Sequence, residues 1–409
     1  MFKRQKSEAK YVNGSSPSHW QIFCTFLYLG CTSFGGPVAH IGYFRNLLVE
    51  RKNWLNAQAY SDLVALCQFL PGPASSQVGF AIGLVKGGYF GGLAAFLGFT
   101  LPSALILLTF SIGLDFVGGV ASNSLLAGLK LVAVSVVGHA VVMMGNVSTP
   151  DWPRRSMAFL AAVVVLLAGH PFATMFVIFL GGFFGLMLPQ VELQFQKPRD
   201  RIGGYNALVF IILALSLLIL LPILAYLFPT PLFRLLDGFY RSGMLVFGGG
   251  HVVLPLLEGA VVNTGLVSEA DFLVGYGAAQ AIPGPMFAVA AFLGQKADIG
   301  IGGVGGAAIS LLMIFLGPFL LVLGVMPFWE RLRHHKGFRK ALDGVNASVV
   351  GLLAAILINP LTTAAITTFH DAIIAGVGFL FLWRFWLSPI FVVGLIVTLK
   401  VTIDLIAGS

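Results

Sequence analysis

The chain has 409 residues, of which 57% are hydrophobic and only 10% are charged, with a formal net charge of +8. A soluble domain of ordinary composition carries about 25% charged residues, so this composition excludes a soluble protein and predicts an all-α polytopic membrane protein. Because a helix needs about 20 apolar residues to cross the hydrocarbon core, about ten or more membrane segments are expected. The basic residues lie in short segments between apolar runs, which favours contact with membrane lipids and argues against nucleic-acid binding.

Residues 1–19 are expected to form a cytoplasmic N-terminal tail, because their basic residues precede an apolar run that has no small-residue cleavage site. Long apolar runs predict spans at 89–111, 125–147, 156–170, 172–190, 205–228, 301–325, 344–368 and 388–407, with a weaker one at 371–387. Four further segments carry Gly or Pro near the middle: 20–50, 57–86, 239–262 and 270–296. Proline lacks an N–H and disfavours helical geometry before it, so these four segments are predicted to be broken or re-entrant helices.

The breaks repeat one pattern in each half of the chain. The first copy is Phe34-Gly35-Gly36 followed by Gln68-x-x-Pro71-Gly72-Pro73, and the second is Phe247-Gly248-Gly249 followed by Gln280-x-x-Pro283-Gly284-Pro285. At an offset of about 213 residues, Ser135-Val136-Val137-Gly138 also recurs as Ser348-Val349-Val350-Gly351. The sequence therefore predicts a first repeat at 20–200, a linking transmembrane helix at 201–234 and a second repeat at 235–409.

Loop charges indicate how the two repeats are oriented. The loop after the first broken segment is basic and its counterpart is acidic, whereas further along the bias reverses between 112–124 and 331–340. Because basic loops stay in the cytoplasm, equivalent loops are expected on opposite sides of the membrane. The repeats are thus predicted to have inverted topology, which is a recurring plan of secondary transporters.

The breaks are also suited to anions. The second proline of each Pro-Gly-Pro is expected at the first position of a new helix, so that the next amides point into the break. A helix N-terminus carries partial positive charge and free N–H donors, and two such ends would suit a small dianion. The candidate substrate-binding residues of the first half are Phe34, Gly35, Gly36, Pro37, His40, Arg45, Gln68, Pro71, Gly72, Pro73, Ser75, Ser76 and Lys86. Those of the second half are Phe247, Gly248, Gly249, Gly250, His251, Gln280, Pro283, Gly284, Pro285 and Lys296.

Each of these residues also has a structural interpretation. Gly and Pro are common in membrane helices, a histidine there is usually a packing residue, and lysines at helix ends extend towards the interface. Arg45 would equally serve as an anchor at the cytoplasmic face. Metal-site, nucleotide-binding and nucleophile-elbow motifs are missing from the sequence, so no enzyme activity and no cofactor are expected.

The paired motifs resemble the chromate transporter family. The stretch from Phe34 to Arg45, with Trp54 and the first Pro-Gly-Pro, is similar to the first domain of that family, and Phe247 to His251, with Pro255 and the second Pro-Gly-Pro, is similar to the second. The resemblance covers about residues 20 to 360. It implies a multi-pass protein of the bacterial cytoplasmic membrane that exports chromate and confers chromate resistance. Gly250 stands where the first copy has Pro37, so the two half-sites are not expected to be identical.

The leading hypothesis is a secondary transporter that exports chromate by alternating access between the repeats. A transporter of sulfate or a related oxyanion, and a non-transporting receptor or scaffold, are the alternatives. Transport direction, ion coupling and oligomeric state stay open, although small-residue runs such as Gly181-Gly182 would permit close helix contact in a homodimer.

Overall fold

A computed structural model of the chain describes residues 17–34, 36–114, 120–168, 171–188, 205–247, 253–300, 303–329, 336–384 and 389–406. Within these ranges every regular element is helical and none is a strand. By length and composition, five helices are able to cross a membrane: Ala74–Leu114, Ser124–Ser148, Ala207–Leu227, Gly303–Phe328 and Lys340–Ala365. The described residues therefore confirm the all-α membrane class, whereas the ten or more segments stay a prediction.

Helices of the first half begin and end at the predicted breaks. They are α1 (His19–Thr32), α2 (Gly36–Phe44), the π-helical η2 (Arg45–Arg51), α3 (Ala57–Phe69), α4 (Ala74–Leu114), α5 (Val120–Ser148), α6 (Trp152–Ala168) and α7 (Pro171–Gly185). The first Phe-Gly-Gly motif separates α1 from α2, and the first Pro-Gly-Pro separates α3 from α4.

The second half repeats this order after one additional helix, α8 (Tyr205–Leu227). Its elements are α9 (Pro231–Met244), α10 (Val253–Val261), α11 (Glu269–Ala281), the 3₁₀ turn η4 (Met286–Ala288), α12 (Val289–Lys296), α13 (Gly303–Val325), η5 (Met326–Phe328), α15 (Lys336–Ile356), η6 (Leu357–Thr362), α16 (Thr363–Ala365), α17 (Phe369–Arg384) and α18 (Pro389–Ile406). The second Pro-Gly-Pro lies between α11 and η4.

Helix α4 is a hairpin with two arms. Its backbone leaves helical geometry at Gly87 and Gly88, which separates a first arm, 74–86, from a second arm, 89–114. The arms meet at Gly83 and Gly91, where a Cβ on either residue would lie 2.3 Å from the carbonyl oxygen of the other. Only glycine permits this approach. In the second half, α12 and α13 meet in the same way at their own pair of glycines.

The second arm of α4 packs against α13, and the two helices run in opposite directions. The Phe96 ring lies 4.9 Å from that of Phe319, which is near the C-terminal end of α13. Towards the C-terminal end of α4, the Ser111 hydroxyl donates a hydrogen bond to Gln295. Gln295 lies at the end of α12, which meets the N-terminal end of α13. The opposite ends of both helices contact α8.

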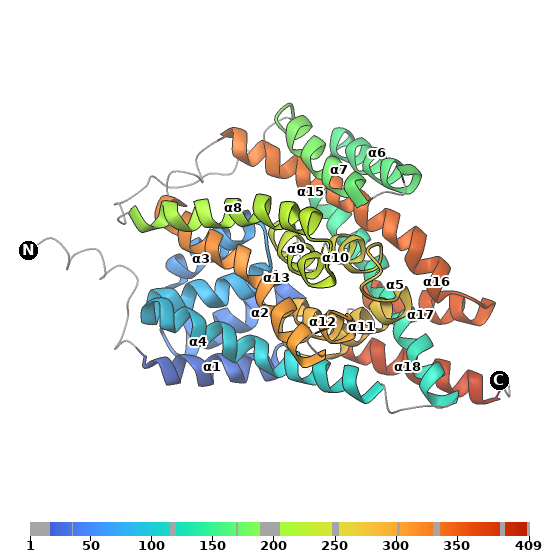
Figure 1. Cartoon of the computed structure of the whole chain (residues 1–409). Helices are drawn as coiled ribbons and strands as arrows, with labels where there is room; N and C mark the ends of the chain where they lie inside the picture. Colours follow the sequence, from blue (N-terminus) through green and yellow to red (C-terminus); the bar gives the residue numbers. More distant parts are fainter. Residues whose placement is uncertain are drawn as a thin grey trace, which may run out of the picture.

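The two halves exchange packing partners through their later helices. Helix α5 packs against α17 and α18, whereas α15 packs against α6 and α7 (Figure 1). The Ser135 hydroxyl donates to the Ala375 carbonyl at 2.9 Å, and a Cβ on Gly344 would lie 2.1 Å from the carbonyl oxygen of Gly181. Gly181 thus provides a close helix contact within one chain, whereas a homodimer stays a prediction.

Many large apolar side chains face outward. Phe90 of α4, Leu167 of α6 and Tyr226 of α8 are 73%, 82% and 85% exposed. Helix α8 is the most apolar of the five long helices and contributes little to the interior. An exterior of this kind is stable in hydrocarbon and would aggregate in water, in agreement with a multi-pass membrane protein.

Candidate functional site

Each Pro-Gly-Pro is hydrogen bonded to the other half of the chain. The amide of Gly72 donates to the carbonyl of Val246 at 2.7 Å, and the amide of Gly284 donates to the carbonyl of Ser33 at 2.9 Å. Ser33 and Val246 occupy equivalent positions, each directly before a Phe-Gly-Gly motif. The four breaks are therefore joined in two crossed pairs.

The glycines of both pairs occupy conformations that other residues rarely adopt. Gly72 has a φ of +124°, and a Cβ there would lie 2.7 Å from the Cβ of Pro318 in α13. Gly284 has a φ of +95°, and its Cβ would lie 2.9 Å from the Ser103 hydroxyl in α4. Each turn thus packs closely against the proline-containing helix of the opposite half. Glycine is required at both positions, because other residues rarely adopt this φ and their Cβ would overlap that helix.

The breaks lie well inside the predicted membrane. Pro102 and Ser103 stand near the middle of the second arm of α4, about 20 Å along a helix of about 39 Å at a rise of 1.5 Å per residue. Gly284 contacts this level of the helix. Since the hydrocarbon core is about 30 Å thick, the crossed pairs are expected near the bilayer midplane.

The first Pro-Gly-Pro ends in a helix N-terminus, although not with proline at the first helical position as expected. Helix α4 begins at Ala74, and the Pro73 carbonyl accepts a hydrogen bond from the amide of Gln77 at 2.9 Å. Pro73 is thus the N-cap, because its carbonyl accepts the first hydrogen bond of the helix. The amides of Ala74, Ser75 and Ser76 remain without intrahelical acceptors. His40 of α2 reaches this end, with Nδ1 3.3 Å from the Ser75 hydroxyl.

Gln77 joins the two halves, and the sequence analysis did not select it. Its side chain is fully buried and donates from Nε2 to the Pro71 carbonyl at 2.9 Å and to the Pro318 carbonyl at 3.3 Å. The predicted Gln68 is instead exposed on α3. The signal available for Gln77 was a polar run, Ser-Ser-Gln, that begins two residues after the Pro-Gly-Pro at the start of an otherwise apolar helix.

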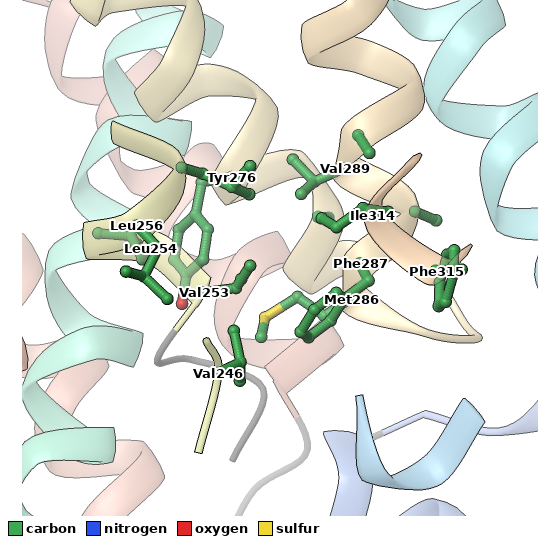
Figure 2. Close-up of a cluster of buried hydrophobic side chains, with 14 of the residues drawn as sticks. Val246, Val253, Leu254, Leu256, Tyr276, Met286, Phe287, Val289, Ile314 and Phe315 are labelled. Atoms are coloured by element: carbon green, nitrogen blue, oxygen red, sulfur yellow. The ribbon is translucent and has the colours of Figure 1, made fainter. Parts of the chain in front are cut away.

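The second Pro-Gly-Pro has a different local structure. Pro285 also precedes the first turn and does not begin the helix, since its carbonyl accepts from the amide of Ala288 in a 3₁₀ turn. Gln280 is half-buried, and its Nε2 lies 2.9 Å from the sulfur of Met286. Pro283 is half-buried beside them. Figure 2 shows Met286 in a cluster of buried apolar side chains.

The remaining predicted residues are spread along the fold. Phe34 and Pro37 are half-buried at the first break, where Gly36 has a φ of +78° and begins α2. Arg45 is exposed, with its Nε 3.6 Å from a carboxylate oxygen of Glu50. Lys86 is buried at the far end of the first arm of α4, about 18 Å from Ala74 at 1.5 Å per residue. Lys296 is half-buried at the end of α12, similarly far from a break.

Five predicted site residues fall outside the described residues: Gly35, Gly248, Gly249, Gly250 and His251. Among the described residues, no group of three or more His, Cys, Asp or Glu side chains is arranged to hold a metal ion. The site chemistry consists of backbone amides, hydroxyls, an imidazole and a carboxamide. These groups bind oxygen-rich anions by hydrogen bonding without fixed countercharge.

The apolar exterior and the buried breaks define a multi-pass α-helical membrane protein, and transporters of this class bind their ions at polar groups inside the membrane. A sequence model of the chromate transporter family matches residues 20–186 and again residues 233–401. The chain belongs to the chromate transporter family, whose members are transporters and not enzymes.

Several curated relatives align over most of the chain. An uncharacterised transporter of Methanocaldococcus jannaschii is 30% identical over 363 residues, which cover 87% of each chain. A chromate transport protein of Pseudomonas aeruginosa is 27% identical over 92% of this chain and 90% of its own. A chromate transport protein of Cupriavidus metallidurans is 25% identical over 89% and 88%. No solved structure matches this chain.

Proposed function

We propose that this chain exports chromate, or a tetrahedral oxyanion of the same charge, across the inner membrane of a cell and thereby confers chromate resistance. Family membership supports the chromate-type cargo. The observation that carries the site is the crossed pairing of Gly72 with Val246 and of Gly284 with Ser33, because it joins each break to one of the other half and sets the turns against the middle level of α4 and α13. A helix N-terminus and neutral hydrogen-bond donors at that level suit a dianion that must also be released.

The two halves are proposed to have inverted topology, as repeats at 20–200 and 235–409 linked by the segment 201–234, which includes α8. Supporting this, the second arm of α4 and its counterpart α13 pack antiparallel, and α5 and α15 each pack against the last two helices of the other half. Reciprocal contacts of this kind are expected from a two-fold axis in the membrane plane.

Transport by alternating access is proposed to move one half against the other around the crossed pairs. The halves meet there through few hydrogen bonds and through stacked aromatic rings, such as Phe80 on Phe319 at 4.3 Å. A membrane potential that is negative inside favours expulsion of a dianion by about 4.6 kcal/mol per 100 mV, twice the value for one charge. Efflux is therefore expected to proceed without a coupled cation.

A flux assay tests this proposal. Everted vesicles carrying the protein are expected to accumulate labelled chromate, faster with an inside-positive potential, and Pro71→Ala and Pro283→Ala are expected to slow accumulation at equal protein amounts. Absence of flux in wild type would support a receptor or scaffold. Sulfate in excess distinguishes the cargo: strong competition, with sulfate flux of its own, would favour a broader oxyanion transporter. Chromate accumulation in right-side-out vesicles, compared with that in everted vesicles, tests the direction of transport.

Topology is tested separately by labelling single cysteines in a protein without Cys24, Cys31 and Cys67. Lys52 and Thr264 are exposed in equivalent connections of the two halves. With inverted halves, Lys52→Cys reacts with an impermeant maleimide only in everted vesicles, and Thr264→Cys reacts only in intact cells. Labelling of both from the same side would rule out the inverted arrangement.

A further inference from the structure

The two halves bring opposite chemistry to the crossed pairs. The first half contributes polar side chains, which are Ser33 before its Phe-Gly-Gly, His40 on α2, and Ser75 and Ser76 at the start of α4. The equivalent residues of the second half are Val246, Val253, Phe287 and Ala288. Figure 2 shows three of these, Val246, Val253 and Phe287, within one cluster of buried apolar side chains. Among the described residues, the pairs are therefore polar on one side and apolar on the other.

The polar side carries buried atoms that lack hydrogen-bond partners. These are Ser33 Oγ, His40 Nε2, Ser76 Oγ, Gln77 Oε1 and Thr100 Oγ1, all on side chains that are at most 3% exposed. Leaving one such group unpaired costs about 1–3 kcal/mol. Each of the five belongs to a residue that contacts the crossed pairs or stands within about one helical turn of one that does. Buried polar groups are nearly always paired, so exceptions around the same pairs indicate a partner that does not belong to the chain.

We propose that the transported oxyanion is bound by the first half alone, through the hydroxyls of Ser33, Ser76 and Thr100, the imidazole of His40 and the N-terminal amides of α4. This inference rests on the proposed function and assigns its binding site. The second half supplies the Gly284 turn and an apolar wall of Val246, Met286 and Phe287 (Figure 2), and its described residues do not contribute a matching half-site. The prediction that both Pro-Gly-Pro helix ends bind the ion is thereby replaced.

The donor set fits an oxyanion. Each hydroxyl has a hydrogen to donate, and the Ser75 hydroxyl can donate to His40 Nδ1, which leaves Nε2–H as a further donor. Gln77 Oε1 is an acceptor and fits a bound water or the hydroxyl of a protonated oxyanion. The apolar wall strengthens these hydrogen bonds, because it lowers the local dielectric constant. Gln77 acts as a positioning residue, since its Nε2 fixes the first Pro-Gly-Pro against Pro318.

The unpartnered hydroxyls make a sharp test possible. Ser33→Ala, Ser76→Ala and Thr100→Val each remove a group that bonds to nothing in the protein, so none is expected to lower the melting temperature. Each is expected to raise the Kd for chromate by about 10- to 100-fold, as for loss of a hydrogen bond to a charged ligand. The matched control is Ser310→Ala, because Ser310 Oγ is also buried and unpartnered but lies on α13, about 12 Å along the helix from Pro318.

Binding is measured on the purified protein in nanodiscs with chromate, molybdate and sulfate as probes, together with the melting temperature of each variant. The inference predicts weaker binding in the three first-half variants, and a change of less than about twofold in Ser310→Ala. If wild type binds but the first-half variants bind equally well, or if Ser310→Ala weakens binding as much as they do, the one-sided site is wrong while the transport proposal stands. If wild type binds none of the three dianions, both are wrong.

Discussion

The amide of Gly72 donates a hydrogen bond to the carbonyl of Val246, 2.7 Å away, although these residues belong to different halves of the chain. The reciprocal bond from Gly284 to Ser33 makes the arrangement two-fold in character. Among the described residues, neither half pairs its own Phe-Gly-Gly with its own Pro-Gly-Pro in this way. One half alone would therefore leave both of its turns without these partners, and we expect the site to form only when the halves fold together.

Replacing Gly72 by alanine tests this contact. Gly72→Ala adds a Cβ that would overlap Pro318 in addition to the strain of a positive φ. Gly265→Ala is the matched control, because Gly265 also has a positive φ, +74°, but has nothing within 4 Å of the added atom. Gly72→Ala is expected to destabilise the protein by about 1–3 kcal/mol more than the control does. Melting of the purified proteins measures this, and equal melting temperatures would contradict the packing described here.

Gln77 is expected to matter for stability where Gln68 does not. Gln77→Leu removes the donor shared by the Pro71 and Pro318 carbonyls and leaves both without that partner. A loss of about 1–3 kcal/mol is expected from the buried unpaired groups. Gln68→Leu, at an exposed position of α3, is expected to change the free energy of unfolding by less than about 0.5 kcal/mol. A similar loss in both variants would show that Gln77 does not hold the halves together.

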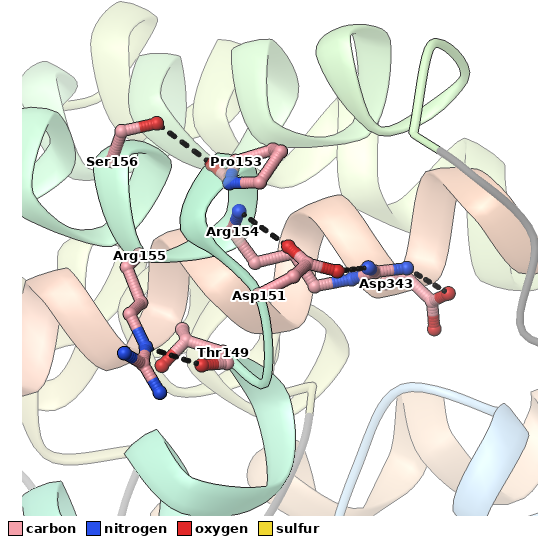
Figure 3. A network of polar contacts seen from close by, with 7 residues as sticks. All are labelled: Thr149, Asp151, Pro153, Arg154, Arg155, Ser156 and Asp343. Carbon is pink, nitrogen blue, oxygen red and sulfur yellow. Dashed lines mark hydrogen bonds and ion pairs between the residues drawn. The ribbon is translucent and has the colours of Figure 1, made fainter.

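The buried Arg154 joins α6 of the first half to α15 of the second. Its guanidinium forms ion pairs with Asp151 and with Asp343, the latter at 3.1 Å (Figure 3). Arg154→Met is expected to cost about 1.5–3 kcal/mol, as for charged hydrogen bonds. Arg45→Met, which breaks an exposed pair with Glu50, is expected to cost less than about 1 kcal/mol. Because Arg154 is shielded from solvent, high salt is expected to leave the stability difference between wild type and Arg154→Met unchanged.

A second ion-pair network joins the last two helices. Lys400 of α18 lies 2.9 Å from a carboxylate oxygen of Asp371, which is 1% exposed, and 2.9 Å from one of Asp404. Lys400→Met would leave the Asp371 charge buried without its cation, at an expected cost of about 3–5 kcal/mol. Asp404→Asn retains the buried pair and is expected to cost about 1 kcal/mol or less. Equal losses in the free energy of unfolding for Lys400→Met and Asp404→Asn would show that the buried Lys400–Asp371 pair contributes no additional stability.

The places where helices break could be read from the sequence with good accuracy. Proline without an N–H and glycine without a Cβ end α1 and α3 at the predicted motifs, because these effects are local. The positions of Lys86 and Gln68 were not predictable in the same way. A helix of 13 residues carries Lys86 well away from the break, and the phase of α3 exposes Gln68, so nearness in sequence was a poor guide to nearness in space.

The sequence by itself determined the membrane class, the two repeats, the breaks and the family, since composition, periodicity and backbone chemistry are properties of short segments. Only the tertiary structure decided that each break pairs with the opposite half, that Gln77 joins the halves, and that polar groups gather on one side of the crossed pairs. These features depend on hydrogen bonds and packing between residues far apart in the chain, where the partner is chosen by how the helices fit together.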